Sequence, residues 1–414
     1  MSKTAIHHRF STGYKQTNLG PLPNTWKAVL LGDLFVFKNG LNKAKGFFGS
    51  GTPIVNYMDV FEHPGLRPGD LLGRVNLTPE EIRNFKVQKG DVFFTRTSET
   101  VEDIGVASVM LYEPHDTVFS GFVLRARPRD GQLDDHYKQY CFANRVVRSQ
   151  IISNATYTTR ALTNGRTLST VWIAVPPIPE QRAIAEALSD VDGLINALDA
   201  LIAKKRAIKQ ATMQQLLTGK TRLPGFSGAW IEKPLVDLAL ITMGQSPSSL
   251  FYNLRGEGLP LIQGNADIEN RQTIERVWTT QASKRCDSGD LILTVRAPVG
   301  AVAIASKDAC IGRGVCSLRP FEDSDFLFHA LVYAEDRWQT LEQGSTFTAA
   351  NSEQVGQFRL RVPANKDEQQ AIASILSDMD AEITALEQRR DKTLAIKQGM
   401  MQQLLTGRVR LGMQ

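Results

Sequence analysis

The sequence predicts a mixed α/β chain: two tandem α+β domains, each followed by a long α-helix. Three observations support this fold class. One segment of the chain is repeated 188 residues later, without a gap and with most residues identical. Short β-branched or aromatic runs precede both copies, as in domains rich in strands. The copies themselves carry apolar residues at the heptad spacing of packed helices.

The repeat is clearest where each half of the chain ends. Residues 180–198, EQRAIAEALSDVDGLINAL, align without a gap with residues 368–386, EQQAIASILSDMDAEITAL. The match continues into KQATMQQLLTGKTRL and KQGMMQQLLTGRVRL. Upstream the spacing drifts, and Gly40 corresponds to Gly244 at 204 residues. A drifting spacing indicates insertions in a shared domain, and so long a period indicates domain duplication rather than a solenoid.

The repeat divides the chain into four predicted segments. They are a first domain with an N-terminal tail (1–179), a central helix (180–222), a second domain (223–367) and a C-terminal helix (368–414). Runs such as GDVFFT and FVLRARP in the first domain, and GDLILTV and VCSLRP in the second, read as strands bounded by Gly, Pro or Asp.

Each predicted helix carries an apolar seam that needs a partner. The seam residues are Ile184, Leu188, Val191, Ile195 and Leu198 in the first helix, and Ile372, Leu376, Met379, Ile383 and Leu386 in the second. Gly219 and Gly407 follow where a left-handed glycine closes a helix. The seam covers either the helix's own domain or the other helix. The shared register favours an antiparallel coiled coil with pseudo-two-fold symmetry.

Composition argues against several classes of protein. The sequence has no apolar run long enough to span a membrane and no apolar signal segment at its start. The four cysteines lack C-x-x-C spacing, so we expect buried thiols and a cytoplasmic protein. LTGKT at 217–221 lacks the first glycine of a phosphate loop, because position 214 is Gln214. The histidines have no metal-ligand spacing, and no catalytic centre can be recognised.

The repeated motifs resemble a known family. The pattern P-x-x-x-E-Q-x-x-I-A-x-x-L-x-x-x-D runs from Pro176 to Asp192, and a variant with one extra residue runs from Pro363 to Asp380. Both are followed by K-Q-x-x-M-Q-Q-L-L-T-G, and the first domain opens with a P-x-x-W…L-x-D-L-like stretch. Over essentially the whole chain this resembles the type I restriction–modification specificity subunit.

The resemblance implies a function in DNA recognition. In that family each globular part is a target recognition domain that reads one half of a split, asymmetric double-stranded DNA sequence, and the helices form a spacer. The subunit has no activity alone. It binds two methyltransferase subunits, which methylate adenine N6 with S-adenosylmethionine. Restriction subunits add ATP- and Mg²⁺-dependent cleavage of unmodified DNA. The resemblance therefore implies no cofactor in this chain.

Base readout needs polar side chains that reach base edges. The candidates in the first domain are Thr95, Arg96, Thr97, Ser98, Arg160, Asn164 and Arg166. Those in the second domain are Arg296, Arg313, Ser345, Thr346, Thr348 and Asn351. For any one of these residues the alternative is an ordinary solvated position on the surface.

The charge of the chain is unevenly distributed. Its net charge is +5, with +6 in residues 1–179 and −3 in residues 223–367. The positive charge of the second domain must therefore be clustered, or partner subunits must supply phosphate contacts. Two alternatives stay open. They are a DNA-modifying enzyme with an unrecognised motif, and a duplicated coiled-coil adaptor with no role on DNA.

Overall fold

The structure is a computed structural model that describes residues 13–157, 159–338 and 349–411. Its contacts divide the chain into two compact units. The N-unit comprises Met1–Ala197 and Arg390–Gln414, and the C-unit comprises Leu198–Arg389. Each long helix thus contributes one half to each unit. The segment boundaries predicted from the sequence stay predictions, because contacts between the helices run across them.

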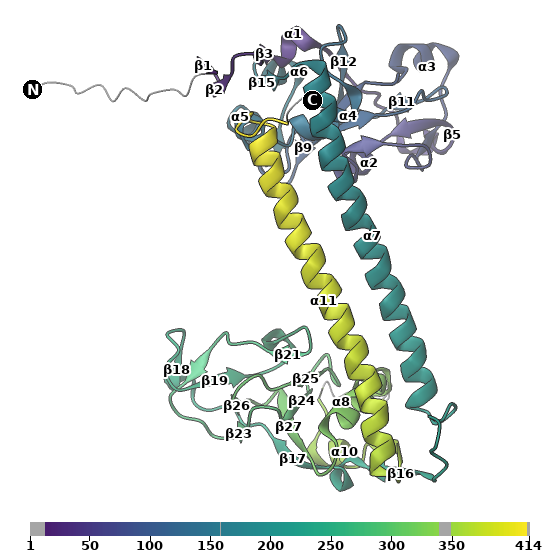
Figure 1. The fold of residues 1–414 in the computed structure, drawn as a ribbon, viewed down its shortest axis with the longest axis vertical. Helices are drawn as coiled ribbons and strands as arrows, with labels where there is room; N and C mark the ends of the chain where they lie inside the picture. Colours follow the sequence, from purple (N-terminus) through teal and green to yellow (C-terminus); the bar gives the residue numbers. More distant parts are fainter. Residues whose placement is uncertain (1–12, 158, 339–348, 412–414) are drawn as a thin grey trace, which may run out of the picture. The chain divides into compact units, whose positions relative to one another are not determined.

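The N-unit is built mainly from short strands with small helices between them (Figure 1). Its strands are β1 (Tyr14–Thr17), β2 (Gly20–Pro23), β3 (Lys27–Leu30), β4 (Phe35–Asn39), β5 (Phe48–Val55), β6 (Gly65–Leu66), β7 (Arg74–Val75), β8 (Val92–Thr95), β9 (Thr97–Ser98), β10 (Ala107–Met110), β11 (Val118–Phe119), β12 (Val123–Pro128), β13 (Thr156–Tyr157), β14 (Ala161–Leu162) and β15 (Trp172–Val175). Its helices are α1 (Leu31–Leu34), η1 (Lys45–Phe47), α2 (Tyr57–Glu62), α3 (Pro79–Phe85), α4 (Asp135–Cys141), α5 (Arg145–Ser153) and α6 (Gly165–Ser169).

The C-unit repeats this plan with different connections. Its strands are β16 (Trp230–Pro234), β17 (Ala239–Met243), β18 (Tyr252–Asn253), β19 (Leu259–Ile262), β20 (Ile268–Glu269), β21 (Gln272–Thr273), β22 (Trp278–Thr279), β23 (Arg285–Cys286), β24 (Leu291–Thr294), β25 (Val302–Ile304), β26 (Ala309–Ile311), β27 (Val315–Pro320) and β28 (Arg359–Pro363). Its helices are η2 (Leu235–Asp237), η3 (Ser249–Phe251), η4 (Asn265–Asp267), α8 (Ser324–Tyr333) and α10 (Ser352–Gly356).

Both units contain the same central sheet. The strand order is β4-β12-β8-β10-β6 in the N-unit and β17-β27-β24-β25-β21-β20 in the C-unit. The first four strands of each order are antiparallel neighbours. In a separate antiparallel pair, the strand that directly precedes the long helix, β15 or β28, pairs with a strand from the start of the same domain, β3 or β16. The mixed α/β fold predicted for two tandem domains is confirmed.

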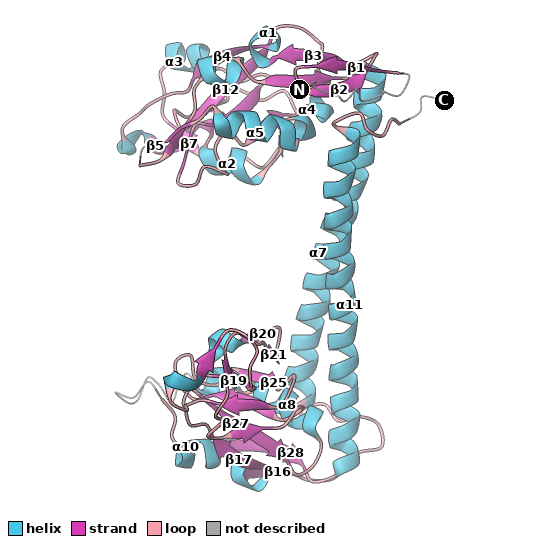
Figure 2. Cartoon of the chain, turned by 90° about the vertical axis from the view of Figure 1, so that its left-hand side faces the viewer, coloured by secondary structure: helices cyan, strands magenta, loops and turns pink. Residues whose placement is uncertain are grey.

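The two long helices are α7 (Ile178–Leu216) and α11 (Lys366–Leu404), each of 39 residues. They begin two residues before the predicted segments. Gly219 and Gly407 both adopt φ +69°, the left-handed backbone that ends a helix and that glycine reaches without strain. In the N-unit the start of α7 lies beside the end of α11, and in the C-unit the end of α7 lies beside the start of α11 (Figures 1 and 2).

The seam residues of each long helix pack both against a globular domain and against the other long helix. Buried seam residues are Ile184, Leu188, Ile195, Leu198, Ile372, Leu376 and Ile383, and half-buried ones are Val191, Met379 and Leu386. In the N-unit, Ile184 and Leu188 join one core cluster with sheet residues, α4, α5 and the end of α11. In the C-unit, Ile372 and Leu376 do the same with the end of α7. Both sequence interpretations of the seam are therefore correct at once.

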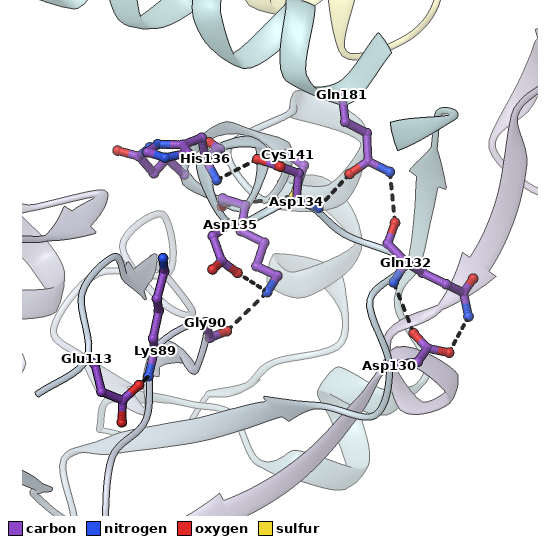
Figure 3. A network of polar contacts seen from close by, with 12 residues as sticks. Lys89, Gly90, Glu113, Asp130, Gln132, Asp134, Asp135, His136, Cys141 and Gln181 are labelled. Carbon is purple, nitrogen blue, oxygen red and sulfur yellow. Dashed lines mark hydrogen bonds and ion pairs between the residues drawn. The ribbon is translucent and has the colours of Figure 1, made fainter. Parts of the chain in front are cut away.

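The Glu-Gln pair that begins each repeat has two separate functions. The Gln181 side chain is buried and ties α7 to its domain: its oxygen accepts from Asp134 N (2.8 Å), and its nitrogen donates to Gln132 O (2.8 Å) (Figure 3). Gln369 likewise donates to Pro363 O (2.9 Å) and to Glu322 (3.1 Å).

The neighbouring glutamate binds an arginine that follows the other helix. In the N-unit, Arg410 makes a bidentate contact with Glu180, with Nη2 2.7 Å from Oε2. In the C-unit, Arg222 makes the same contact with Glu368, at 2.5 and 2.7 Å. Each arginine lies 188 residues from its counterpart, as each glutamate does. The repeated helix ending and the repeated helix beginning are thus two halves of one contact, made once in each unit.

Candidate nucleic-acid interface

Two sequence stretches predicted to contact DNA meet on one edge of the N-unit. Strand β9 pairs antiparallel with β14, with Thr97 opposite Leu162. Directly beyond this pair, Thr163 N donates to Arg96 O at 3.0 Å. The stretches are separated by about sixty residues in sequence, and their pairing places the polar residues of both on a single small sheet.

A hollow of about 410 Å³ lies beside this pair of strands. The predicted residues Thr97, Ser98 and Arg160 line it, together with Tyr57 and Phe122. The Arg160 side chain is 62% exposed, with its guanidinium 3.6 Å from the Glu99 carboxylate, an ion pair that water screens strongly. Hydroxyls, a guanidinium and aromatic rings are groups that contact base edges and thymine methyls.

Other predicted residues of the N-unit have structural functions. Thr95 is fully buried, and its hydroxyl donates to Asp103 O and accepts from Val106 N. A contact between Thr95 and a ligand would require this turn to open. Asn164 is exposed and caps α6, accepting from Thr167 N at 3.0 Å, so its side-chain oxygen is already used by the cap. Arg166 is exposed on the first turn of α6.

The C-unit has a corresponding edge. Arg296 is exposed and forms a β-bridge with Ala349. Asn351 is exposed and caps α10, accepting from Gln354 N at 2.8 Å. Arg313 is exposed, and its backbone N–H donates to Ser246 Oγ at 3.1 Å. The predicted Ser345, Thr346 and Thr348 lie outside the described residues.

The two edges share a backbone scaffold and differ in side chains. Arg96 N donates to Phe122 O at 3.0 Å in the N-unit. In the C-unit, Val295 N donates to Gly314 O at 2.8 Å, between the same two strands of the sheet. Because Phe122 is replaced by glycine at the corresponding place, the C-unit lacks the aromatic ring that lines the N-unit hollow. One scaffold thus presents two different sets of contact groups.

Three exposed basic residues come from neighbouring segments at the C-unit edge, although the second domain is acidic overall. Lys284 is exposed, and its carbonyl accepts a hydrogen bond from Ile311 N at 3.0 Å. Ile311 is two residues before Arg313, so this bond brings the segment of Lys284 to the loop of Arg313. Arg296 is joined to the loop of Arg313 through the neighbouring Val295–Gly314 hydrogen bond. Three exposed basic residues on an acidic domain fit one of the two alternatives drawn from the net charge, clustered positive charge, and the other, phosphate contacts supplied by partner subunits, stays open.

The described residues give no sign of a metal or thiol centre. Within the described ranges, no group of three or more His, Cys, Asp or Glu side chains is arranged to bind a metal ion. All four cysteines are buried, as predicted, and burial raises the pKa of the Cys286 thiol to about 11. No helix of the described chain is long and apolar enough to cross a membrane.

Sequence reasoning missed the aromatic members of the edge. Tyr57 begins α2, and its ring stacks on Phe61 at a centroid distance of 5.8 Å. Phe122 is 63% exposed on the loop before β12. Neither residue carries a sequence signal, because an aromatic residue beside a strand is usually buried.

The chain matches the family model of the type I restriction modification DNA specificity domain twice, at residues 23–210 and 228–395. It is 28% identical over 419 residues to a putative type I restriction enzyme MjaX specificity subunit of Methanocaldococcus jannaschii, covering 96% of this chain and 97% of the relative.

Two solved structures have the same fold. One is a chain from a study of complex assembly and conformational transition of the type I R-M system, with TM-score 0.61 and 21% identity, covering 94% of this chain and 99% of that one. The other is a type I restriction–modification S subunit from M. genitalium, with TM-score 0.59 and 15% identity, covering 97% and 99%. From the two family matches, the chain belongs to the type I restriction-modification DNA specificity family and is a specificity subunit with two such domains.

Proposed function

We propose that the two units read the two halves of one bipartite, asymmetric DNA target. The observation that carries this proposal is the duplicated edge. The same backbone scaffold presents Thr97, Arg160 and Phe122 in the N-unit, and Arg296 and Arg313 in the C-unit. Because the side chains differ, the two half-sites differ, and the target is not a palindrome.

The long helices set the gap between the half-sites and dock two methyltransferase subunits. A helix of 39 residues is about 58 Å long at 1.5 Å per residue, which exceeds the ~20 Å of a six-base-pair gap. The number of helical turns then determines the gap. Ion pairs between the helices, Lys397 with Asp192 in the N-unit and Lys209 with Asp380 in the C-unit, support a fixed register.

Catalysis belongs to the partner subunits in this proposal. The methyltransferase subunits modify adenine N6 with S-adenosylmethionine, and restriction subunits, where present, use ATP and Mg²⁺ to cleave unmodified DNA. This chain is a non-catalytic component that binds double-stranded DNA and its partners and needs no cofactor of its own.

The test is co-expression of this chain with its methyltransferase partner, followed by genome-wide mapping of N6-methyladenine. We expect a split, asymmetric motif, methylated on both strands, that is absent when this chain is omitted. A palindromic motif that persists without the chain would contradict the proposal and favour a coiled-coil adaptor.

Variants assign the half-sites. Arg160→Ala is expected to relax the motif at one half-site, and Arg296→Ala at the other, each by about 5- to 100-fold in preference for the lost base. Arg129→Ala is the matched control. This exposed arginine follows the far end of β12, about 20 Å along the strand from Phe122. An unchanged motif in both edge variants would remove these arginines from base readout.

A further inference from the structure

A short aromatic turn follows the first strand of the central sheet in both units. In the N-unit, β4 is followed by η1 and then by Phe48 at the start of β5. In the C-unit, β17 is followed by η3 and then by Tyr252 at the start of β18. Each turn lies 204 residues from the other, the same spacing that relates Gly40 to Gly244.

The two turns have the same hydrogen bonds. Phe47 N donates to Ala44 O at 3.1 Å, and Phe251 N donates to Ser248 O at 3.1 Å. The residue after each phenylalanine closes the 3₁₀ turn in the same way. The two sequences, AKGFF and SSLFY, share only the first aromatic residue. The duplicated chain has thus retained a turn geometry that presents a phenylalanine while its other residues changed.

These apolar side chains face solvent. Phe47 is 47% exposed and Phe48 is 41% exposed, and in the C-unit Leu250 is 89% exposed and Phe251 is 39% exposed. Single exposed apolar residues are ordinary, but adjacent ones on corresponding turns of both units form a patch of the kind that marks an interaction surface.

The N-unit turn adjoins the polar edge. Asn42 precedes the turn and packs on Gly121, where a Cβ would lie 2.0 Å from Asn42 Oδ1. Gly121 N donates to Leu41 O at 2.7 Å, and Gly121 O accepts from the Arg96 guanidinium at 3.5 Å. The aromatic turn and the predicted residue Arg96 are therefore separated by a single strand-connecting loop.

The C-unit turn adjoins its edge through different residues. Ser246, at the start of the turn, accepts from Arg313 N. The Tyr252 hydroxyl donates to Pro247 O at 3.1 Å and accepts from Gln263 Nε2 at 3.0 Å, which fixes the turn against the sheet. Leu250 and Phe251 are thus presented on a rigid support rather than on a free loop.

Basic residues flank both turns. In the N-unit, Lys45 is exposed, and Lys43 lies 4.6 Å above the Phe47 ring and 2.6 Å from Glu81. In the C-unit, Lys284 and Arg313 lie beside the base of the turn. Apolar side chains surrounded by lysine and arginine fit a ligand with phosphates outside and flat apolar surfaces inside, which is duplex DNA.

We propose that the two aromatic turns are DNA-contact elements of this subunit. Phe47 and Phe48 in the N-unit, and Leu250 and Phe251 in the C-unit, pack against a thymine methyl or a base step, and the flanking basic residues bind phosphates. This inference rests on the proposed reading of DNA by the two edges and extends that contact surface to residues with no hydrogen-bonding groups.

The test uses the complex of the full chain with its methyltransferase partner, and a duplex that carries the mapped target. Leu250→Ser is the first variant, because so exposed a side chain contributes little to folding. We expect it to weaken binding about 10-fold with the salt dependence unchanged. Lys284→Ala is expected to lower the slope of log affinity against log salt by about 1. Phe47→Ala applies the first test to the N-unit.

Exposed apolar residues elsewhere provide matched controls. The controls are Phe321→Ala in the C-unit and Leu72→Ala in the N-unit. Phe321 follows the far end of β27 and is 61% exposed, and Leu72 is 84% exposed. If the wild-type complex binds its target and the turn variants bind as tightly as these controls, the turns do not contact DNA. If the turn variants instead lose the methyltransferase subunit in the absence of DNA, the turns are protein-docking surfaces. If the wild-type complex shows no sequence preference, the proposed function itself fails.

Discussion

The two units differ at the place where each domain meets both long helices. In the N-unit, the Tyr140 hydroxyl on α4 donates to Asp192 on α7 at 2.9 Å. Lys397 on α11 binds the other oxygen of Asp192 at 2.5 Å and lies 5.7 Å from the centre of the Tyr140 ring. The pKa of Tyr140 is raised, first by burial and then by the charge of Asp192.

In the C-unit a histidine takes the place of the tyrosine. Nε2 of His329, on α8, is 3.1 Å from Ser377 Oγ, and Nδ1 of the same ring is 3.9 Å from the Asp380 carboxylate. Lys209 on α7 binds Asp380, as Lys397 binds Asp192 in the other unit. The Nδ1 atom is buried and makes no hydrogen bond in the described chain.

The difference has consequences for charge. A tyrosine donates to the aspartate while staying neutral, so its junction is the same at every physiological pH. A neutral histidine beside a lysine–aspartate pair is instead held against protonation. Burial, and then the charge of Lys209, lower the pKa of His329 to about 4, although Asp380 and Asp323 oppose this. Two copies of one junction therefore differ in their response to acid.

The largest effect is expected where a buried carboxylate loses its arginine. Glu368 is only 1% exposed, and Arg222→Ala leaves it without its bidentate partner. We expect this variant to lower the free energy of unfolding by about 3 kcal/mol. Arg410→Ala is expected to cost about 1.5 kcal/mol less, because Trp26 Nε1 still donates to Glu180 at 2.9 Å. The corresponding Trp230 Nε1 is buried without a hydrogen-bond partner in the described chain.

Urea unfolding, with hydrogen exchange measured on peptides from each unit, checks this ranking. Lys220→Ala and Arg408→Ala, exposed positions two residues before each arginine, are the controls. Equal losses for the two arginine variants would mean that the Trp26 indole adds nothing to the N-unit contact.

The second effect depends on pH. The folded pKa of His329 lies below its unfolded value of about 6.5, so the unfolded chain binds more protons between the two values. The His329 contribution is therefore fully present above pH 6.5 and is lost as pH falls toward 4, by about 3 kcal/mol in all. We expect C-unit peptides to lose exchange protection on acidification.

The variant His329→Gln keeps a donor for Ser377 and removes the titrating group. We expect it to reduce the loss of C-unit stability between pH 6.5 and pH 4. His136→Gln, an exposed histidine on α4 of the N-unit, is the control. An unchanged pH slope in His329→Gln would assign acid sensitivity to other groups.

The repeat predicted much of this architecture. The two helices match without a gap, so the apolar seam residues occupy the same heptad positions in both copies. Their burial, and the packing of one helix on the other, follow from this pattern. The contact of Trp26 with Glu180 could not be predicted, because it joins residues 154 positions apart whose chemistry suggests no pairing. The long helices, by contrast, are predictable because their apolar residues recur at heptad spacing in the sequence.

The candidate edge was predictable only in part. Polar composition drew attention to the stretches around Thr97 and Arg160. The pairing of β9 with β14 could not be predicted, because strands of two residues carry no periodicity. Polar composition also could not separate Thr95, which is fully buried and whose hydroxyl bonds within a turn, from the half-buried Arg96 and Thr97 beside it. Exposed aromatic residues such as Phe122 resemble core residues until the fold places them.

The smallest effect tests whether the N-unit junction is insensitive to acid. Tyr140→Phe removes one hydrogen bond to Asp192, which keeps its ion pair with Lys397, so the expected cost is about 1 kcal/mol. Because neither tyrosine nor phenylalanine titrates below neutrality, this cost should be equal at pH 5 and pH 8. Unfolding of the N-unit at both pH values measures it, with the exposed Tyr157→Phe as control. A cost that changed with pH would show that the N-unit junction also responds to acid, and the contrast drawn between the tyrosine and histidine junctions would then fail.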